Sequence, residues 1–271
     1  YKGRDKVKPV LYLVIPCYNE EDMLPITSKA LLKKMNELIS GGMISPESKV
    51  MFVDDGSKDK TWELIQVLHD YDPMFTGLKL SRNKGHQNAL LAGLMTAKDY
   101  ADIIISMDAD LRDDINAIDG FLEKRAEGCD IVYGVRSSRE TDTAFKRGTA
   151  EAYYKILAKM GVEITYNHAD YRLMSKRAVE GLAEFKEVNL FLRGLVPMVG
   201  YKSGVVKYRR AERQAGESKY PLKKMLAFAM EGITSLSVKP IRFITSLGLG
   251  VYVVSLLMLV YFLITYWAGE A

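Results

Sequence analysis

The chain has 271 residues, 48% of them hydrophobic and 27% charged, which excludes a wholly disordered protein and allows one large domain or two small ones. Its net charge of +4 is too small to indicate a nucleic-acid-binding protein, so we expect no nucleic-acid partner. Two cysteines, Cys17 and Cys129, are too few for a disulfide framework and fit a reducing compartment.

Short apolar runs alternate with helical patterns over the first 135 residues. We expect strands at 10–15, 49–53, 77–80, 102–107 and 130–133, and helices at 20–39, 61–69, 85–97 and 115–125. Pro16 is expected to end the first strand, and Asn19 to cap the first helix. Strands that alternate with helices predict a parallel sheet covered on both faces, with ligands bound beyond the carboxyl ends of the strands.

The pattern becomes less regular after residue 135. We expect a helix at 145–160 and a strand near 203–209. Residues 221–236 are amphipathic, which predicts a helix lying in a membrane interface, the alternative being a surface helix packed on the domain. Pro240 is expected to break the chain before the next helix.

The positive charge is concentrated in residues 201–224, which contain eight Lys or Arg and two Glu. Residues 243–269 then carry no charge and exceed the ~20 apolar residues that span a bilayer. We expect a transmembrane helix there, with Tyr261, Tyr266 and Trp267 near its end; the alternative is a buried helix of a soluble core. The positive-inside bias puts the preceding domain in the cytoplasm, and the polar N-terminal residues do not resemble a signal peptide.

Two acidic turns follow predicted strands. Asp108 and Asp110 stand two residues apart, where paired carboxylates can hold Mg²⁺ or Mn²⁺ together with phosphates and water; a solvated turn is the alternative. Asp54 and Asp55, followed by Gly56, can accept hydrogen bonds from a nucleotide base or ribose. The sequence contains no Gly-x-Gly-x-x-Gly or Walker motif, which argues against NAD and ATP sites, and its three scattered histidines do not suggest zinc.

Four motifs occur in the order and spacing of family 2 glycosyltransferases with the GT-A fold, which the chain resembles: PCYNE at 16–20, VDDGS at 53–57, NKGHQ at 83–87 and MDAD at 107–110. Three more resemble the polyprenyl-phosphate branch, which includes dolichyl-phosphate mannose synthases and bacteriophage GtrB-type enzymes: YGVR at 133–136, NHADYRLM at 167–174 and R-x-x-G-x-S-K-Y at 213–220. The resemblance covers almost the whole chain.

The resemblance implies a role for each matching residue. Those implied to bind the sugar nucleotide are Pro16, Tyr18, Glu20, Asp54, Asp55, Lys84 and Asp108. Those implied to meet the acceptor and donor phosphates are Arg136, Arg147, Arg213, Ser218 and Lys219. Asp108 and Asp110 match the positions that hold Mg²⁺ or Mn²⁺. Asp170 matches the catalytic base, with a structural salt bridge to Arg172 as the alternative.

One position departs from the family pattern. Arg112 stands where the family usually has a glutamine whose oxygen can join the metal, and a guanidinium has no acceptor atom. Either Asp113, Asp114 or water replaces that ligand, or Arg112 turns outward, or this chain binds the metal less tightly.

The resemblance implies an α/β domain of the Rossmann-like GT-A type at 1–220, with a nucleotide-sugar half up to about 135 and an acceptor half at 136–220. A juxtamembrane helix at 221–240 and a transmembrane helix at 241–269 would follow. The implied activity is inverting transfer of glucose or N-acetylglucosamine from a UDP-sugar to polyprenyl (undecaprenyl) phosphate for cell-envelope glycans, by an integral protein of the bacterial plasma membrane with a cytoplasmic catalytic domain.

Two alternatives to this activity stay open. One is a processive polysaccharide synthase of the same fold, although the sequence lacks the Gln-x-x-Arg-Trp signature of those enzymes. The other is a catalytically degenerate membrane scaffold. We also expect self-association, because a single membrane helix per chain is a small attachment.

Overall fold

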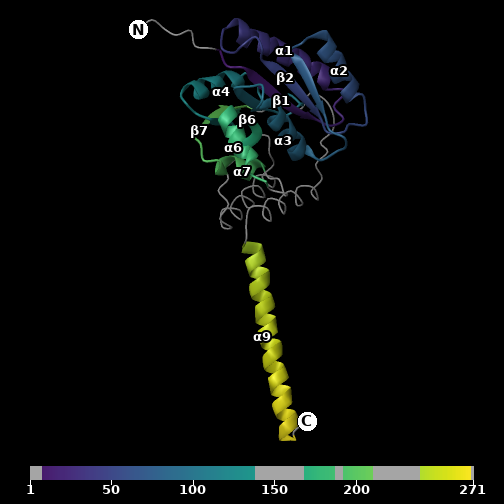
Figure 1. Ribbon diagram of the computed structural model, residues 1–271, viewed down its shortest axis with the longest axis vertical. Helices are drawn as coiled ribbons and strands as arrows, with labels where there is room; N and C mark the ends of the chain where they lie inside the picture. The colour runs from purple at the N-terminus through teal and green to yellow at the C-terminus, as the bar shows by residue number, and fades with distance from the viewer. Residues whose placement is uncertain (1–7, 138–167, 187–191, 210–238, 270–271) are drawn as a thin grey trace.

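The computed structural model describes residues 8–137, 168–186, 192–209 and 239–269. These residues form an α/β domain and a long separate helix (Figure 1). The helices expected at 145–160 and 221–236 lie outside the described residues.

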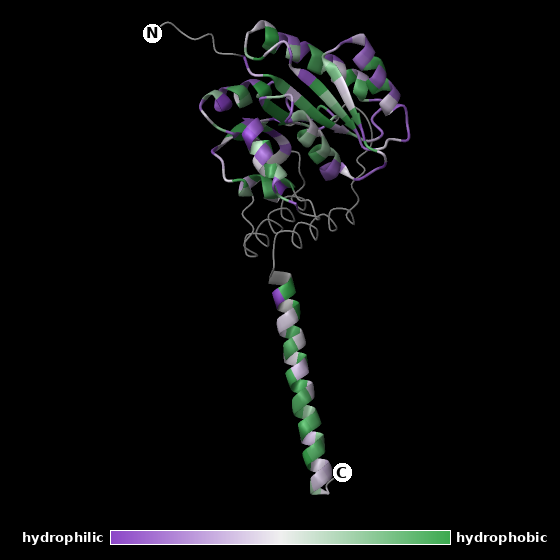
Figure 2. Ribbon diagram, in the orientation of Figure 1, coloured by the Kyte–Doolittle hydropathy of each residue, from purple (hydrophilic) through white to green (hydrophobic). Residues whose placement is uncertain are grey.

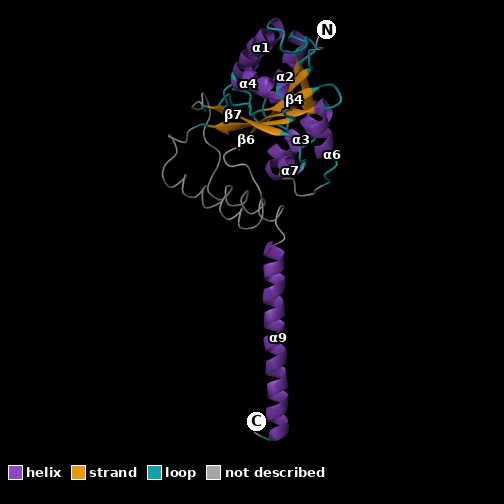
Figure 3. Cartoon of the chain, turned by 90° about the vertical axis from the view of Figure 1, so that its left-hand side faces the viewer, coloured by secondary structure: helices purple, strands orange, loops and turns teal. Residues whose placement is uncertain are grey.

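The sheet has seven strands in the order β3-β2-β1-β4-β6-β5-β7. Their bounds are β1 Leu11–Cys17, β2 Lys49–Asp54, β3 Phe75–Lys79, β4 Ile103–Ser106, β5 Ile131–Arg136, β6 His168–Ser175 and β7 Ser203–Tyr208. Every neighbouring pair is parallel except those of β6, which runs antiparallel between β4 and β5. The mostly parallel sheet predicted from the alternating pattern is therefore confirmed, with β6 as the one reversed strand among those described. Figure 3 shows the sheet with helices on either side.

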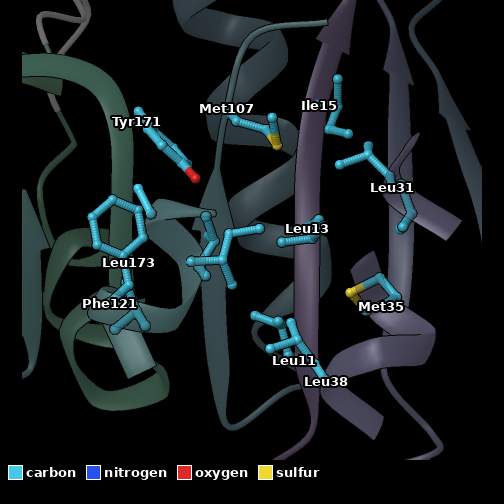
Figure 4. Close-up of a cluster of buried hydrophobic side chains, with 14 of the residues drawn as sticks. Leu11, Leu13, Ile15, Leu31, Met35, Leu38, Met107, Phe121, Tyr171 and Leu173 are labelled. Carbon is cyan, nitrogen blue, oxygen red and sulfur yellow. The ribbon is translucent and has the colours of Figure 1, made fainter. Parts of the chain in front are cut away.

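Helices cover both faces of the sheet. One face packs against α1 (Leu24–Ser40), α2 (Thr61–Tyr71) and α4 (Ala117–Ala126), and the other against α3 (His86–Ala97), α6 (Lys176–Ala183) and α7 (Leu192–Met198). Because successive strand residues point to opposite faces, Leu13 of β1 joins the first core and Val14 the second. Figure 4 shows the first core, with Leu31 and Met35 of α1 around β1.

Strand β6 was not predicted, and its composition explains why. Its sequence HADYRLMS places a charged Asp170 and Arg172 inside the protein, so it lacks the apolar run by which the other strands were recognised. Helices α6 and α7 follow in a region whose pattern was mixed. These three elements complete the sheet and one of its covering layers.

The roles expected for Asn19 and Pro16 at element boundaries were wrong. Helix α1 begins at Leu24 with Met23 at the cap position, so Asn19 does not cap it; Asn19 instead has a positive φ of 53° and accepts a hydrogen bond from the Lys58 N–H. Strand β1 continues through Pro16, which is tolerated because pairing with β4 ends at Val14. Pro240 lies in the first turn of α9 (Lys239–Ala268), where its missing N–H costs no hydrogen bond. The residues before this helix lie outside the described part of the chain, so the break expected there stays a prediction.

Helix α9 is the most apolar of the described helices. Its segment Ile244–Ala268 has a mean hydropathy of 2.5 over its most apolar window, and none of that window is buried against the rest of the chain. Figure 2 shows hydrophobic residues along the whole length of the helix. At about 1.5 Å per residue, 25 residues exceed the ~30 Å hydrocarbon core of a bilayer, so α9 is a candidate membrane span.

Candidate active site

The predicted site residues gather at one edge of the sheet. The parallel strands β1, β2, β4, β5 and β7 end at this edge, and the antiparallel β6 begins there. The residues brought to it are Tyr18, Glu20, Asp54, Asp55, Asp108, Asp110, Arg136 and Asp170. Because β6 runs antiparallel, Asp170 near its start lies beside the carboxyl ends of the other strands.

Asp55 organises the loop that precedes α3. Its two carboxylate oxygens accept hydrogen bonds from the backbone N–H groups of Lys84 (2.7 Å) and Gly85 (2.9 Å). Gly56 has a φ of +67°, and a Cβ there would lie 2.6 Å from the backbone of Arg82, so the two loops need a glycine at their contact. Asp55 thus fixes the shape of the loop, and its implied contact with a nucleotide stays a prediction.

Asp54 has an oxygen without a partner among the described residues. The side chain is fully buried, its Oδ1 atom accepts the Ser57 N–H at 3.0 Å, and its Oδ2 atom has no hydrogen bond. Burial of an unsatisfied carboxylate oxygen is costly, and because this atom is enclosed, the implied contact of Asp54 with a nucleotide stays a prediction.

The remaining residues implied to bind the nucleotide differ in accessibility. Pro16 is buried within β1, whereas Tyr18 is 39% exposed and offers an aromatic face at the strand end. The Glu20 N–H donates to Thr61 Oγ1, which ties this turn to the start of α2. Lys84 is exposed, with its backbone N–H on Asp55.

Asp108 and Asp110 follow β4 and are both half-buried. Asp110 Oδ1 accepts the Arg112 N–H at 3.2 Å across Leu111, whose φ is +51°. Their oxygen donors fit Mg²⁺ or Mn²⁺. No group of three His, Cys, Asp or Glu able to hold a metal occurs in the described part of the chain, so the two carboxylates would need further oxygens from a substrate and water.

The structure narrows the alternatives for Arg112. Asp113 is buried and accepts a 2.6 Å hydrogen bond from the Tyr208 hydroxyl, while Asp114 Oδ1 accepts the Asn116 N–H at 2.9 Å. Asp113 is therefore engaged elsewhere, whereas Asp114, like Asp110, accepts one local backbone hydrogen bond. Arg112 itself is half-buried, and its Nε atom is enclosed with no hydrogen bond among the described residues, so it does not turn wholly outward. Burial, together with Asp113, raises the pKa of Tyr208 and keeps it a hydrogen-bond donor.

Asp170 lies between two arginines. Its Oδ1 atom accepts from Arg172 at 2.6 Å and its Oδ2 atom from Arg193 at 3.0 Å, so the salt bridge to Arg172 exists. Burial alone would raise the pKa of Asp170, but Arg193, His86 and Arg172 lower it well below its ordinary value. The carboxylate is therefore ionised at neutral pH and is a weak base.

Comparison with known proteins identifies the protein family to which this chain belongs. The model of the family described as Glycosyl transferase family 2 matches residues 12–182. The chain is a family 2 glycosyltransferase.

Several relatives match most of this glycosyltransferase. It is 55% identical to the uncharacterized glycosyltransferase YkoT of Bacillus subtilis over 248 residues, covering 92% of this chain and 74% of that protein. It is 42% identical to a prophage bactoprenol glucosyl transferase homolog of Escherichia coli, with 88% and 75% covered. The bactoprenol glucosyl transferase of Shigella phage SfV is 41% identical, with 90% and 78% covered.

Solved structures confirm the GT-A fold of the glycosyltransferase. Mannosyl-3-phosphoglycerate synthase from Rubrobacter xylanophilus aligns with a TM-score of 0.51 at 15% identity, covering 84% of this chain and 73% of that one. The mannosyltransferase PcManGT from Pyrobaculum calidifontis, in complex with GDP-Man and Mn²⁺, aligns with a TM-score of 0.50 at 16% identity, with 84% and 70% covered. At these identities the likeness concerns the fold.

His86 and Arg193 join the glycosyltransferase site although their roles were not predicted. His86 Nε2 lies 3.9 Å from Asp108 Oδ1 and 3.6 Å from Asp170 Oδ2, so it stands between the two carboxylates. Burial alone would lower the pKa of His86, but Asp170 and Asp108 raise it. The position of His86 within NKGHQ at a predicted helix start could have indicated it, whereas nothing in the sequence links Arg193 to Asp170, 23 residues earlier.

The implied phosphate-binding residues are only partly described. Arg136 ends β5 at the site edge and is half-buried. Arg147, Arg213, Ser218 and Lys219 lie outside the described residues, as does most of the basic segment 201–224.

Proposed function

We propose that this glycosyltransferase transfers glucose or N-acetylglucosamine from a UDP-sugar to polyprenyl phosphate, and that it does so at a membrane. The observation that carries the proposal is the extended similarity to proteins named bactoprenol glucosyl transferase, 41–42% identical over most of both chains. The apolar helix α9 supports it, because a lipid acceptor requires access to a bilayer.

On the donor side, the chain supplies groups held in place at the strand ends. Asp55 fixes the loop at 84–85, and Tyr18 offers a ring for a base. Asp108 and Asp110 would hold Mg²⁺ or Mn²⁺, which when bound would stabilise the negative charge of the departing nucleoside diphosphate.

On the acceptor side, little base catalysis is needed. A phosphate monoester has a second pKa near 6 and is largely dianionic at neutral pH, so it can attack the sugar without losing a proton to a strong base. The lowered pKa of Asp170 suits such an acceptor. We assign Asp170 to the catalytic centre, where it orients the positive groups around it, and a single in-line attack would invert the anomeric carbon.

The location of the domain follows from the same reasoning. We propose that α9 anchors the chain in the bacterial plasma membrane and that the basic residues at 201–224 keep the catalytic domain on the cytoplasmic side. There the domain would meet both a cytoplasmic sugar nucleotide and the phosphate end of a lipid.

Nucleotide release tests the proposal and separates the alternatives. The full chain, in detergent, is incubated with UDP-glucose, UDP-N-acetylglucosamine or GDP-mannose, with and without undecaprenyl phosphate. We expect release of UDP from one UDP-sugar, dependent on the lipid, with one sugar added per lipid. Growing saccharide chains would indicate a processive synthase, and no release from any donor would contradict the proposal.

A further inference from the structure

Asp170 is paired with more than one basic side chain. Asp170 is a single carboxylate, yet the guanidinium groups of Arg172 and Arg193 both bond to it, at 2.6 Å and 3.0 Å. His86 Nε2 lies 3.6 Å from the same carboxylate and 3.9 Å from that of Asp108, so basic and acidic side chains alternate at this edge of the sheet. A guanidinium group held at such an edge can bind an anion such as a phosphate.

The two arginines differ in accessibility. The Arg172 side chain is 2% exposed and also donates to the Leu192 carbonyl, so it is enclosed by the chain. The Arg193 side chain is 28% exposed. Since Arg193 bonds to the same carboxylate from a solvent-accessible position, it is the guanidinium that an incoming anion can reach.

Helix α7 holds Arg193 in place. The Leu192 N–H donates to Gln87 Oε1 of α3 at 3.1 Å, and the Leu192 carbonyl accepts from Arg172 at 3.4 Å, so the residue before Arg193 is fixed from both sides. Leu192, Leu195 and Val196 anchor the helix in the second core. A guanidinium held in one orientation loses less entropy when it binds a ligand.

We infer that Arg193 is a phosphate-binding residue of this reaction, held ready by Asp170 and delivered by α7. An arginine fork matches the geometry of phosphate oxygens and can bind two of them at once. The inference rests on the proposed function, in which two phosphate groups enter the site: the lipid monophosphate and the donor diphosphate. Figures 1 and 3 both show α7 on the side of the domain nearest α9, which favours the lipid.

Equilibrium binding to the full chain separates the two phosphates. The probes are farnesyl phosphate, with farnesol as the uncharged comparison, and UDP with Mg²⁺. We expect Arg193→Gln to weaken binding of farnesyl phosphate by about tenfold or more, with farnesol and UDP changed by less than about twofold. A selective loss of UDP binding would instead identify the donor diphosphate as the ligand. Equal binding of both phosphates by the native chain and Arg193→Gln would overturn the inference.

Two further variants distinguish binding from folding. Arg193→Lys keeps a positive charge beside Asp170 but lacks the guanidinium fork. We therefore expect an unchanged unfolding temperature and partial recovery of farnesyl phosphate binding. Lys176→Gln removes the same charge at the opposite, exposed end of β6 and should bind both probes normally. A loss of binding that follows the unfolding temperature across these variants would assign Arg193 a structural role only.

Measurements on the native chain and on Arg193→Gln can test this inference separately from the proposed function. A native chain that binds farnesyl phosphate through Arg193 but moves no sugar to undecaprenyl phosphate would contradict the proposed function and support the inference. Equal sugar transfer by the native chain and by Arg193→Gln, at the same KM for the lipid, would support the proposed function and contradict the inference.

Discussion

Arg172 is the residue whose placement most constrains the site. It is fully buried, its Nε atom has no hydrogen bond among the described residues, and Asp170 is its charged partner. Burial lowers the pKa of Arg172, and the Asp170 charge opposes this change. The pair is therefore needed for the fold as well as for the site. A variant of either residue must be tested for both stability and activity.

Substituting Asp170 with Asn tests that dual role. We expect Asp170→Asn to lower the free energy of unfolding by about 3 kcal/mol or more at pH 7, because a buried guanidinium loses its counter-charge. The folded-state pKa of Asp170 is below its ordinary value, so this stabilisation is present above about pH 4 and is lost as pH falls through the folded-state pKa. Unfolding of both proteins measured from pH 3 to pH 8 checks this; a difference that stays constant with pH would contradict it.

Arg112 gives a prediction about metal dependence. An arginine beside Asp110 brings a fixed positive charge to the place where a diphosphate would bind, and it offers no ligand to a metal. We expect the native chain to need less Mg²⁺ or Mn²⁺ than Arg112→Gln, both for UDP binding and for transfer. Lys124→Gln, which removes an exposed charge on α4, is the control. Superimposable metal titrations of the native chain and Arg112→Gln would contradict this prediction of weaker metal dependence.

Sequence reasoning located the residues that follow strands and missed those that meet through folding. Asp55 and Asp108 were predicted at the sheet edge because each follows an apolar run. Arg193 and His86 reach Asp170 only because α7 packs beside α3, and no periodic pattern encodes such a contact. The ion pair with Arg172 was foreseen as an alternative because residues two apart in a strand share a face.

The loop between β3 and α3 is the element most dependent on a single side chain. Asp55 binds two consecutive backbone N–H groups of this loop, those of Lys84 and Gly85. We expect Asp55→Ala to speed amide hydrogen exchange at both positions and to raise the KM for the UDP-sugar by about tenfold, because the loop loses the side chain that fixes it.

A matched substitution lies at the opposite end of the sheet. Asp72→Ala removes a carboxylate that accepts the Met74 N–H, and we expect exchange at Lys84 and Gly85 to stay slow in that variant. Slow exchange at these two amides in Asp55→Ala as well would show that other contacts hold the loop.

At the level of elements, the parallel part of the sheet was predictable and its completion was not. Strands β1, β2 and β4 are buried on both faces and read as continuous apolar runs. Strand β6 contains the buried ion pair of Asp170 and Arg172, so a search for apolar runs does not detect it.

The described residues combine an α/β domain with an apolar helix whose most apolar window is not buried against them. Both native cysteines are buried, and burial raises the pKa of the Cys17 thiol, so single exposed cysteines can be labelled selectively. We expect an impermeant maleimide to label Ala268→Cys in intact cells and Lys202→Cys only after permeabilisation. The reverse pattern would contradict the proposed cytoplasmic domain.

Transfer of label from UDP-[¹⁴C]glucose or UDP-[¹⁴C]N-acetylglucosamine to undecaprenyl phosphate tests the central claim most directly. We predict that the full chain moves label into the organic phase from one of these donors, and that Asp110→Asn, which removes a proposed metal ligand, abolishes the transfer at an unchanged unfolding temperature. Label that stays in the aqueous phase with both donors, in the presence of the lipid and Mg²⁺ or Mn²⁺, would contradict the account.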